Sequence, residues 1–120
     1  MAVVSKFESP ALEYAALNSL NLHDLIVGAQ HHAIFFARAV GDNLRSIGLF
    51  DGDVLVANRA ATAKDGDVVI AIVDDEFVTR IFDQTNRRLI CDSGPAISCE
   101  GIVIEAVVVQ SVRCFRKLMI

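Results

Sequence analysis

The stretch DGDVVIAIVDDEFVTRIF, residues 65–82, decides the fold of this chain. Residues 68–73 form a continuous apolar run of strand length, which is typical of a strand that is buried on both faces. Asp74 and Asp75 interrupt this run, and a second strand-like run follows from Phe77 to Phe82. Two such runs on either side of a short polar break predict a β-hairpin.

Further strand-like segments flank this hairpin. Residues 33–40 and 54–58 precede it, and residues 102–104 and 106–113 follow it after a loop at 92–95. The periodicity of a helix is present only in pieces, and it predicts one or two helical turns at residues 22–27. With about seven strands and little helix, the predicted fold class is mostly β, built of folded sheets with one short helix.

The tetrapeptide Asp-Gly-Asp-Val occurs twice, at residues 51–54 and 65–68. Aspartate and glycine supply the tight backbone geometry that precedes a strand. We therefore interpret this echo as repeated turn chemistry and not as a duplicated structural unit.

Length and composition indicate a single domain. A chain of 120 residues is long enough for one core and too short for two good ones. Because proline blocks a continuing helix or central strand at Ser9-Pro10, we expect a short arm at residues 1–9 and one domain at residues 10–120. Hydrophobic residues make up 53% and aromatic residues 7%, which predicts a core of Val, Ile, Leu and Ala.

Charge and cysteine content limit the possible functions. The net charge of -4, from 11 basic and 15 acidic residues, gives no electrostatic footprint for nucleic acid. Cys91, Cys99 and Cys114 have no CxxC spacing, so we expect buried thiols in a reducing compartment. The chain has neither the apolar core of a signal peptide nor a run of the ~18 apolar residues that span a bilayer, so we expect a cytoplasmic protein.

Two groups of side chains resemble metal sites, and we interpret both as structural. Several aspartates lie beside a glycine or at a strand end, where a carboxylate caps backbone amides. They are Asp42, Asp51, Asp53, Asp65, Asp67, Asp74 and Asp75. His23, His31 and His32, taken with the cysteines, match no zinc-ligand spacing. No GxSxG, HExxH or phosphate-binding glycine loop is present, so neither a metal nor a cofactor is predicted.

Five motifs occur in an order and spacing that resembles the UmuD and LexA family of self-cleaving serine peptidases. They are SPALEY, LNLHDLIV, FFARAVGDNLRSIGLFDGDVLVANR, DGDVVIAIVDDEFVTRIF and EAVVVQSVRC, in the arrangement typical of UmuD. The resemblance runs from Ser9 to Arg116, nearly the whole chain. It implies the folded β-sheets of the C-terminal domain of LexA and UmuD.

The resemblance also implies the place of an active site. In that family the serine of a Gly-Asp-Ser box is the nucleophile, and a lysine on a hairpin is its general base. The matching positions are Asn43 in GDNL, residues 41–44, and Arg80 in EFVTR, residues 76–80. Asn43 has no hydroxyl, and a guanidinium with a pKa above about 12 cannot act as a base near neutral pH. We therefore expect a pseudo-peptidase that is not an enzyme.

Further expectations concern the surroundings of these two positions. Ser46 lies past the turn, and no lysine on the hairpin could activate it. We expect a hydrogen bond between Asn43 and Arg80, or an ion pair of Arg80 with a carboxylate, because a buried unpaired charge costs several kcal/mol. Eight residues precede Ser9, without a cleavable Cys-Gly or Ala-Gly bond, so the chain resembles processed UmuD and has no room there for a helix-turn-helix.

The resemblance implies a non-enzymatic accessory subunit of a translesion polymerase in the SOS response to DNA damage. The implied partners are a second copy of the chain and a UmuC-type Y-family polymerase, with the RecA filament and full-length UmuD as further ones. Neither nucleic acid nor a membrane is expected to be contacted directly. The alternative is a regulatory dimerisation module, or a decoy that pairs with active UmuD or LexA-type proteins.

The dimer has a physical argument of its own. The apolar residues 106–112 would form an aggregation-prone sheet edge unless they pair across a two-fold axis. The family, by resemblance, dimerises through its C-terminal region. The predicted interface residues are Val107, Val109, Ser111 and Arg113.

Overall fold

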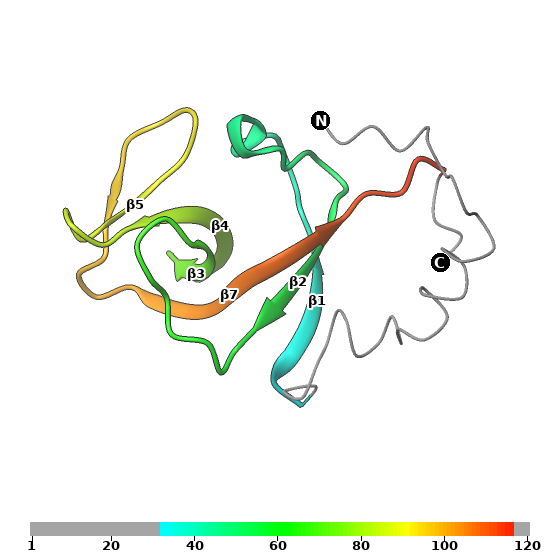
Figure 1. Ribbon diagram of the computed structural model, residues 1–120. Coiled ribbons are helices and arrows are strands. Elements are labelled where there is room, and N and C mark those ends of the chain that lie inside the picture. Colours follow the sequence, from blue (N-terminus) through cyan, green and yellow to red (C-terminus); the bar gives the residue numbers. More distant parts are fainter. Residues whose placement is uncertain (1–31, 117–120) are drawn as a thin grey trace, which may run out of the picture.

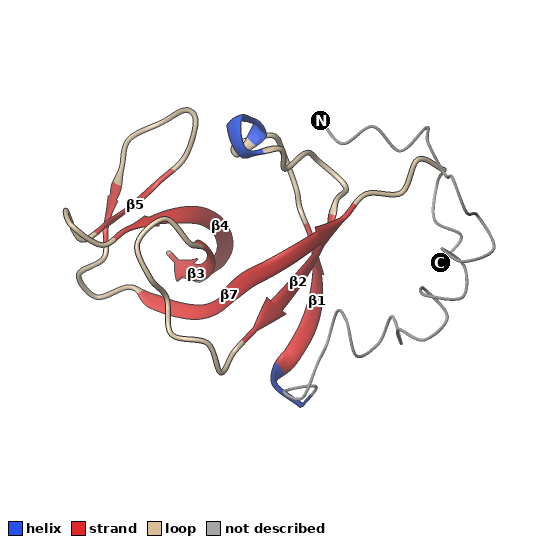
Figure 2. Cartoon of the chain, viewed as in Figure 1, coloured by secondary structure: helices blue, strands red, loops and turns tan. Residues whose placement is uncertain are grey.

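The structure is a computed structural model, and it describes residues 32–116. In this part of the chain, seven strands form one antiparallel sheet in the order β1-β2-β7-β3-β4-β5-β6. The strands are β1 (Ile34–Arg38), β2 (Val54–Asn58), β3 (Val68–Val73), β4 (Glu76–Asp83), β5 (Arg88–Ile90), β6 (Ile97–Ser98) and β7 (Val103–Val112). A 3₁₀ turn at Arg45–Ile47 lies between β1 and β2. Strands and loops dominate Figures 1 and 2, so the prediction of a mostly β fold is confirmed.

The predicted hairpin is formed by β3 and β4. Val73 lies opposite Glu76, which leaves Asp74 and Asp75 as the two turn residues, with φ values of 51° and 65°. Positive φ at both central residues gives the turn a twist that matches the twist of the flanking strands. The pattern that predicted this hairpin is local, and the structure reproduces it within two residues at each end.

The prediction that residues 68–73 are buried on both faces is confirmed for the middle of β3. Val69, Ile70 and Ala71 are at most 4% exposed. Val69 and Ala71 belong to one core cluster and Ile70 to another, because successive side chains of a strand point to opposite faces. This strand therefore joins the two sides of the core.

β7 lies in the middle of the sheet and not at its edge. Val107 pairs with Asn58 of β2 on one side and with Val69 of β3 on the other. The expected bare edge along residues 106–112 is therefore wrong for the first part of this segment, where two neighbouring strands already bond its main chain. The predicted break before residue 106 is absent as well, since β7 runs through Val103–Val112. The described sheet ends at β1 and β6 instead.

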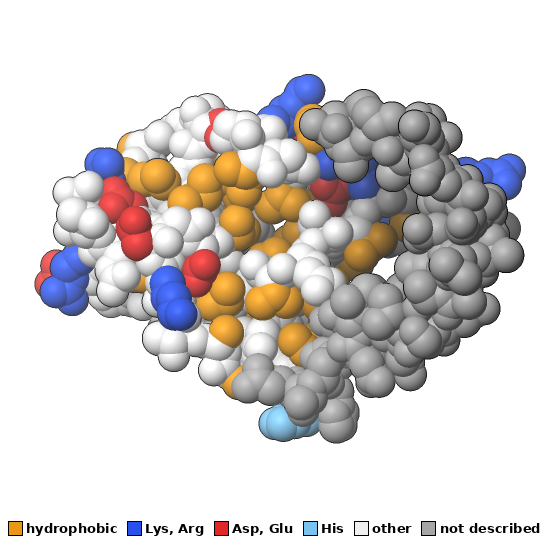
Figure 3. All heavy atoms as spheres, viewed as in Figure 1, with side chains coloured by type: hydrophobic (Ala, Val, Ile, Leu, Met, Phe, Trp, Pro, Cys, Tyr) orange, Lys and Arg blue, Asp and Glu red, His pale blue; other side chains and the backbone are white. Residues whose placement is uncertain are grey.

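Two register shifts bend this sheet around its centre. One lies at Val56/Ala57, where β2 pairs with β7, and the other at Ile70/Ala71, where β3 pairs with β7. Such irregularities raise the local twist of a strand pair. Figure 1 shows the result: β7 crosses the molecule, with β3, β4 and β5 curled to one side and β1 and β2 on the other. Hydrophobic side chains gather across the middle of this view in Figure 3, and charged side chains lie around them.

The two Asp-Gly-Asp-Val segments adopt the same turn. In each, the second aspartate accepts a hydrogen bond from the N–H three residues earlier, from Phe50 to Asp53 at 2.9 Å and from Lys64 to Asp67 at 2.8 Å. The glycine of each turn has a positive φ, 90° in the first and 85° in the second, a conformation that glycine adopts without strain. These shared bonds support the interpretation of the echo as turn chemistry.

Other expectations have mixed outcomes. The helix at residues 22–27 and the arm at residues 1–9 lie outside the described residues. Cys91 and Cys99 are partly buried free thiols, but Cys114 is exposed. The expectation of a buried thiol is therefore wrong for Cys114, because the chain has already left the sheet after β7. Residues 32–116 include no helix of the length and hydropathy that crossing a bilayer requires.

Candidate functional site

A cleft between β1 and β4 contains both positions that the resemblance assigns to the active site. Asn43, from the loop after β1, and Arg80, from β4, line the same cavity of about 490 Å³. The other lining residues are mostly apolar, with two further arginines. They are Phe35, Ala37, Arg38, Ala39, Val40, Gly41, Leu44, Leu49, Leu55, Arg59, Ile70, Phe77, Val78 and Thr79.

Asn43 lies on an exposed turn that is fixed from both sides. Its backbone carbonyl accepts a hydrogen bond from the N–H of Asp92 at 2.8 Å. The next residue, Leu44, is buried and packs with Leu49 and Leu55 in the core. The amide of Asn43 can donate and accept hydrogen bonds, but it offers no hydroxyl for attack on a carbonyl.

Arg80 lies in the middle of β4, opposite Val69 of β3, and is partly buried. Its Nη1 donates to the carbonyl of Thr79 at 2.8 Å. We expected Arg80 to bond to Asn43 or to a carboxylate. Among the described residues it forms neither bond, and its partner is the carbonyl of Thr79. A guanidinium that borders an open cleft keeps access to water, so its charge does not need the carboxylate that full burial would require.

Ser46 is held outside the cleft by Asp92. Its hydroxyl and its N–H both donate to the Asp92 carboxylate, the N–H at 2.8 Å. The bond from the hydroxyl is the largest cause of the lowered pKa of Asp92, and the bond from the N–H of Ser46 adds to the lowering. Ser46 is absent from the cleft lining, and its bonds to Asp92 join the 3₁₀ turn to the loop after β5.

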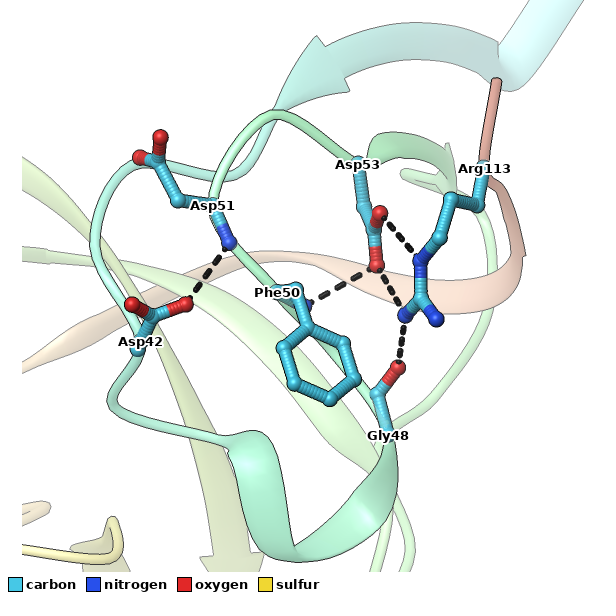
Figure 4. Close-up of polar contacts among 6 residues, drawn as sticks. All are labelled: Asp42, Gly48, Phe50, Asp51, Asp53 and Arg113. Atoms are coloured by element: carbon cyan, nitrogen blue, oxygen red, sulfur yellow. Dashed lines mark hydrogen bonds and ion pairs between the residues drawn. The ribbon is translucent and has the colours of Figure 1, made fainter. Parts of the chain in front are cut away.

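A buried carboxylate supports the loop that carries Asn43. Asp53 is 3% exposed, and Figure 4 shows its two oxygens facing the guanidinium of Arg113. Arg113 also donates to the carbonyl of Gly48 at 2.6 Å and lies over the ring of Phe50, 4.3 Å from its centroid. The hydrogen bonds from Arg113 are the largest cause of the lowered pKa of Asp53, burial acts in the opposite direction, and the N–H of Phe50 adds to the lowering.

The capping role predicted for the turn aspartates is confirmed for five of them. Asp42, Asp51, Asp53, Asp65 and Asp67 each accept a hydrogen bond from a backbone N–H. Asp74 and Asp75 form the hairpin turn itself. Within residues 32–116, no three His, Cys, Asp or Glu side chains converge on a point that could hold a metal ion.

The predicted dimer residues differ in what they can offer a partner. Val107 is 6% exposed and belongs to the core, and Arg113 is engaged with Asp53 of its own chain. Val109, which is 45% exposed, and the exposed Ser111 remain available on the surface. The dimer interface therefore stays a prediction that rests on these last two residues and on the resemblance.

Sequence reasoning did not find two basic side chains of the cleft, Arg38 and Arg59. Arg38 ends β1, and Arg59 directly follows β2. Arg59 lies 3.4 Å from Glu105 and stacks over the ring of Phe35 at 4.2 Å from its centroid. No local pattern marks either residue, because only the curl of the sheet brings β1 and β4 to opposite sides of one cavity.

Known proteins share the part of the chain that builds this cleft. Residues 5–96 match the Peptidase S24-like family, a span that includes Asn43 and Arg80. The chain belongs to the Peptidase S24-like family. Protein SamA of Salmonella typhimurium is 34% identical to this S24-like chain over 90 residues, which cover 75% of the chain and 63% of SamA.

Two further relatives extend the comparison. Protein ImpA of Escherichia coli is 37% identical over 91 residues, which cover 76% of this chain and 57% of ImpA. The LexA repressor of Shewanella frigidimarina is 32% identical over 89 residues, which cover 68% of the chain and 44% of the repressor. The S24-like chain thus spans less than two thirds of the length of these relatives.

Proposed function

We propose that this S24-like chain is a catalytically inactive accessory subunit of a translesion DNA polymerase, similar to processed UmuD, and that it acts in the SOS response to DNA damage. The observation that carries the proposal is that Asn43 and Arg80 line one cleft. They occupy the positions that the resemblance gives to nucleophile and base, and neither side chain has the chemistry of that role. A cleft that keeps both positions together but has neither a hydroxyl nucleophile nor a lysine base at them supports a role in binding.

The UmuD-like arrangement of motifs favours a polymerase partner. The five motifs follow the order of UmuD, from SPALEY at residues 9–14 to EAVVVQSVRC at residues 105–114. The net charge of -4 suits a subunit that binds other proteins and leaves contact with DNA to them. The proposed assembly is a homodimer of this chain bound to a UmuC-type Y-family polymerase.

The inactive state is tested by cleavage at alkaline pH, where a lysine base would be most active. The protein is incubated alone and with a cleavable full-length UmuD, and fragments are resolved by mass spectrometry. We expect none from the unaltered chain. The double variant Asn43→Ser with Arg80→Lys supplies both the nucleophilic hydroxyl and the lysine base. Each single variant is its control, because a nucleophile without its base, or a base without its nucleophile, does not suffice. Fragments from the unaltered chain would end the claim of inactivity.

The polymerase role is tested by co-purification with a UmuC-type polymerase and, separately, with full-length UmuD. We expect retention of the polymerase by a dimeric form of the chain, with the dimer measured by light scattering at micromolar concentration. Retention by UmuD alone would favour a decoy that pairs with active relatives. A monomer that retains neither protein would contradict the proposed assembly.

A further inference from the structure

We propose that the cleft between β1 and β4 binds an extended peptide with a carboxylate side chain, and that Arg80 and Arg38 recognise this carboxylate. The proposal concerns the ligand of the cleft, and it holds whether or not the chain joins a polymerase. It rests on the charge of the cleft, on the free hydrogen-bonding capacity of two arginines and on the strand that forms one wall.

The cleft has a charge opposite to that of the chain. The chain carries 15 acidic and 11 basic residues. Nevertheless Arg38, Arg59 and Arg80 line the cleft, and no acidic side chain of the described residues does so. Guanidinium groups stay protonated at physiological pH, so the cleft has a local positive potential that favours an anionic group.

Two of the three arginines keep hydrogen-bonding capacity for a ligand. The guanidinium of Arg80 has five N–H donors and gives one of them to a carbonyl of its own strand. Arg38 is exposed and forms no ion pair among residues 32–116. Arg59 differs, because Glu105 partly neutralises it and the ring of Phe35 holds it in place. Arg80 and Arg38 therefore carry the charge that is left for a ligand.

The walls of the cleft suit a peptide chain. Ala37 and Arg38 of β1 line it, followed by residues 39–41 of the loop after this strand, and β1 pairs only with β2 among the described strands. The free side of such an end strand can bond to the main chain of an extended peptide. Phe77, which is 69% exposed, offers an apolar contact to the side chains of that peptide.

The same surroundings disfavour a nucleic acid. Proteins that bind single strands follow the phosphate backbone with a positively charged groove. Here the positive charge is confined to a mostly apolar cavity, and the hairpin turn beside Phe77 carries Asp74, Asp75 and Glu76. These carboxylates repel a polyanion that would have to extend past the hairpin turn.

A displayed library of random octapeptides, selected on the full chain, tests the proposal without assuming a sequence. We expect selected peptides to be enriched in Asp or Glu next to apolar residues. The best peptide is then measured by fluorescence anisotropy beside its Asn or Gln counterpart, which we expect to bind about tenfold more weakly, as the loss of a charge-assisted hydrogen bond predicts. A neutral or basic consensus, or no selected peptide, would overturn the proposal.

Variants assign the binding to the two arginines. Arg80→Gln and Arg38→Gln are each expected to weaken the peptide by about five- to tenfold. Arg80→Lys keeps the charge and should retain most of the affinity, while Arg116→Gln, which removes an exposed charge outside the cleft, is the matched control. Thermal melts verify that each variant is folded. Equal affinity of Arg80→Gln and the unaltered chain, or tighter binding of a single-stranded DNA octamer than of the peptide, would refute the assignment.

Discussion

Asp53 and Arg113 form a bidentate ion pair that joins the start of β2 to the end of β7. Oδ1 of Asp53 lies 2.9 Å from Nε of Arg113, and Oδ2 lies 2.9 Å from Nη2. The same guanidinium covers the ring of Phe50 and bonds to the carbonyl of Gly48 (Figure 4). The last residues of the central strand are thereby attached to the loop that places Asn43 in the cleft.

Replacement of this carboxylate should destabilise the chain. Asp53→Asn keeps the size of the side chain but removes its charge and one acceptor, and it leaves Arg113 without its ion-pair partner. We expect the free energy of unfolding to fall by about 1.5–3 kcal/mol, as for hydrogen bonds to charged groups. Urea denaturation followed by circular dichroism measures this loss.

The second Asp-Gly-Asp-Val turn supplies the control. Asp67 accepts the equivalent bond, from the N–H of Lys64 at 2.8 Å, but it has no arginine partner among the described residues. Asp67→Asn should therefore cost less, about 0.5–1 kcal/mol. Equal losses in the two variants would show that the turn, and not the ion pair, determines the stability.

Stability should fall at acid pH in a way that depends on Arg113. The hydrogen bonds from Arg113 are the largest cause of the lowered pKa of Asp53 in the folded chain. An unfolded aspartate titrates at about 3.9. The stabilisation is therefore complete above the unfolded pKa, and it is lost as the pH falls through the folded pKa. In Arg113→Gln the main cause of the lowering is removed while burial still raises the pKa of Asp53, so the folded and unfolded pKa values move together and less stability is lost as the pH falls.

Urea midpoints between pH 3 and pH 7 compare this variant with the unaltered chain. Asp83 and Asp92 also have lowered pKa values, but they contribute equally to both proteins. Stability curves that run parallel over this range would mean that Arg113 does not control the titration of Asp53.

The parts of the fold that the sequence predicts are those with local causes. The run at residues 68–73, the aspartate pair after it and the strand at residues 54–58 carry their structure in periodicity and turn chemistry, and the structure reproduces them. The place of β7 has no local cause. An apolar run at residues 106–112 suits an edge that needs cover as well as a central strand, and only its pairing with β2 and β3 decides between the two.

The same distinction between local and long-range causes applies to the residues of the candidate site. Asn43 and Arg80 are found because each lies in a contiguous motif, and the structure places both in one cleft. Arg38 and Arg59 have no motif, and their role follows from the curl of the sheet. The contact of Arg113 with Asp53 joins residues 60 positions apart, so sequence reasoning assigned Arg113 to a dimer interface instead.

The turn that carries Asn43 should loosen when Asp92 is changed. The carboxylate of Asp92 accepts two hydrogen bonds from Ser46, and the N–H of Asp92 donates to the carbonyl of Asn43. In Asp92→Ala both bonds from Ser46 are lost. We expect the N–H of Ser46 to exchange with solvent deuterium about tenfold faster, because this N–H no longer has a hydrogen-bond acceptor.

Asp83→Ala is the comparison for this exchange measurement. Asp83 also has a lowered pKa and bonds to Asn86 and Arg88, but these contacts lie in the turn between β4 and β5. Its replacement should leave the exchange of Ser46 unchanged. An unaltered rate in Asp92→Ala would show that the 3₁₀ turn is held by other contacts.

The β3–β4 turn should become more stable when its second residue is glycine. Asp75 has a φ of 65°, in the left-handed region that favours glycine, and two-residue turns with positive φ at both positions prefer Asp-Gly or Asn-Gly. Asp75→Gly should raise the free energy of unfolding by about 0.5–1 kcal/mol, less than the full relief of strain because glycine also gains freedom in the unfolded chain. Asp75→Asn removes the same charge, next to Asp74 and Glu76, while it keeps a side chain. If both variants gave the same gain, repulsion among these carboxylates and not backbone strain would be its cause.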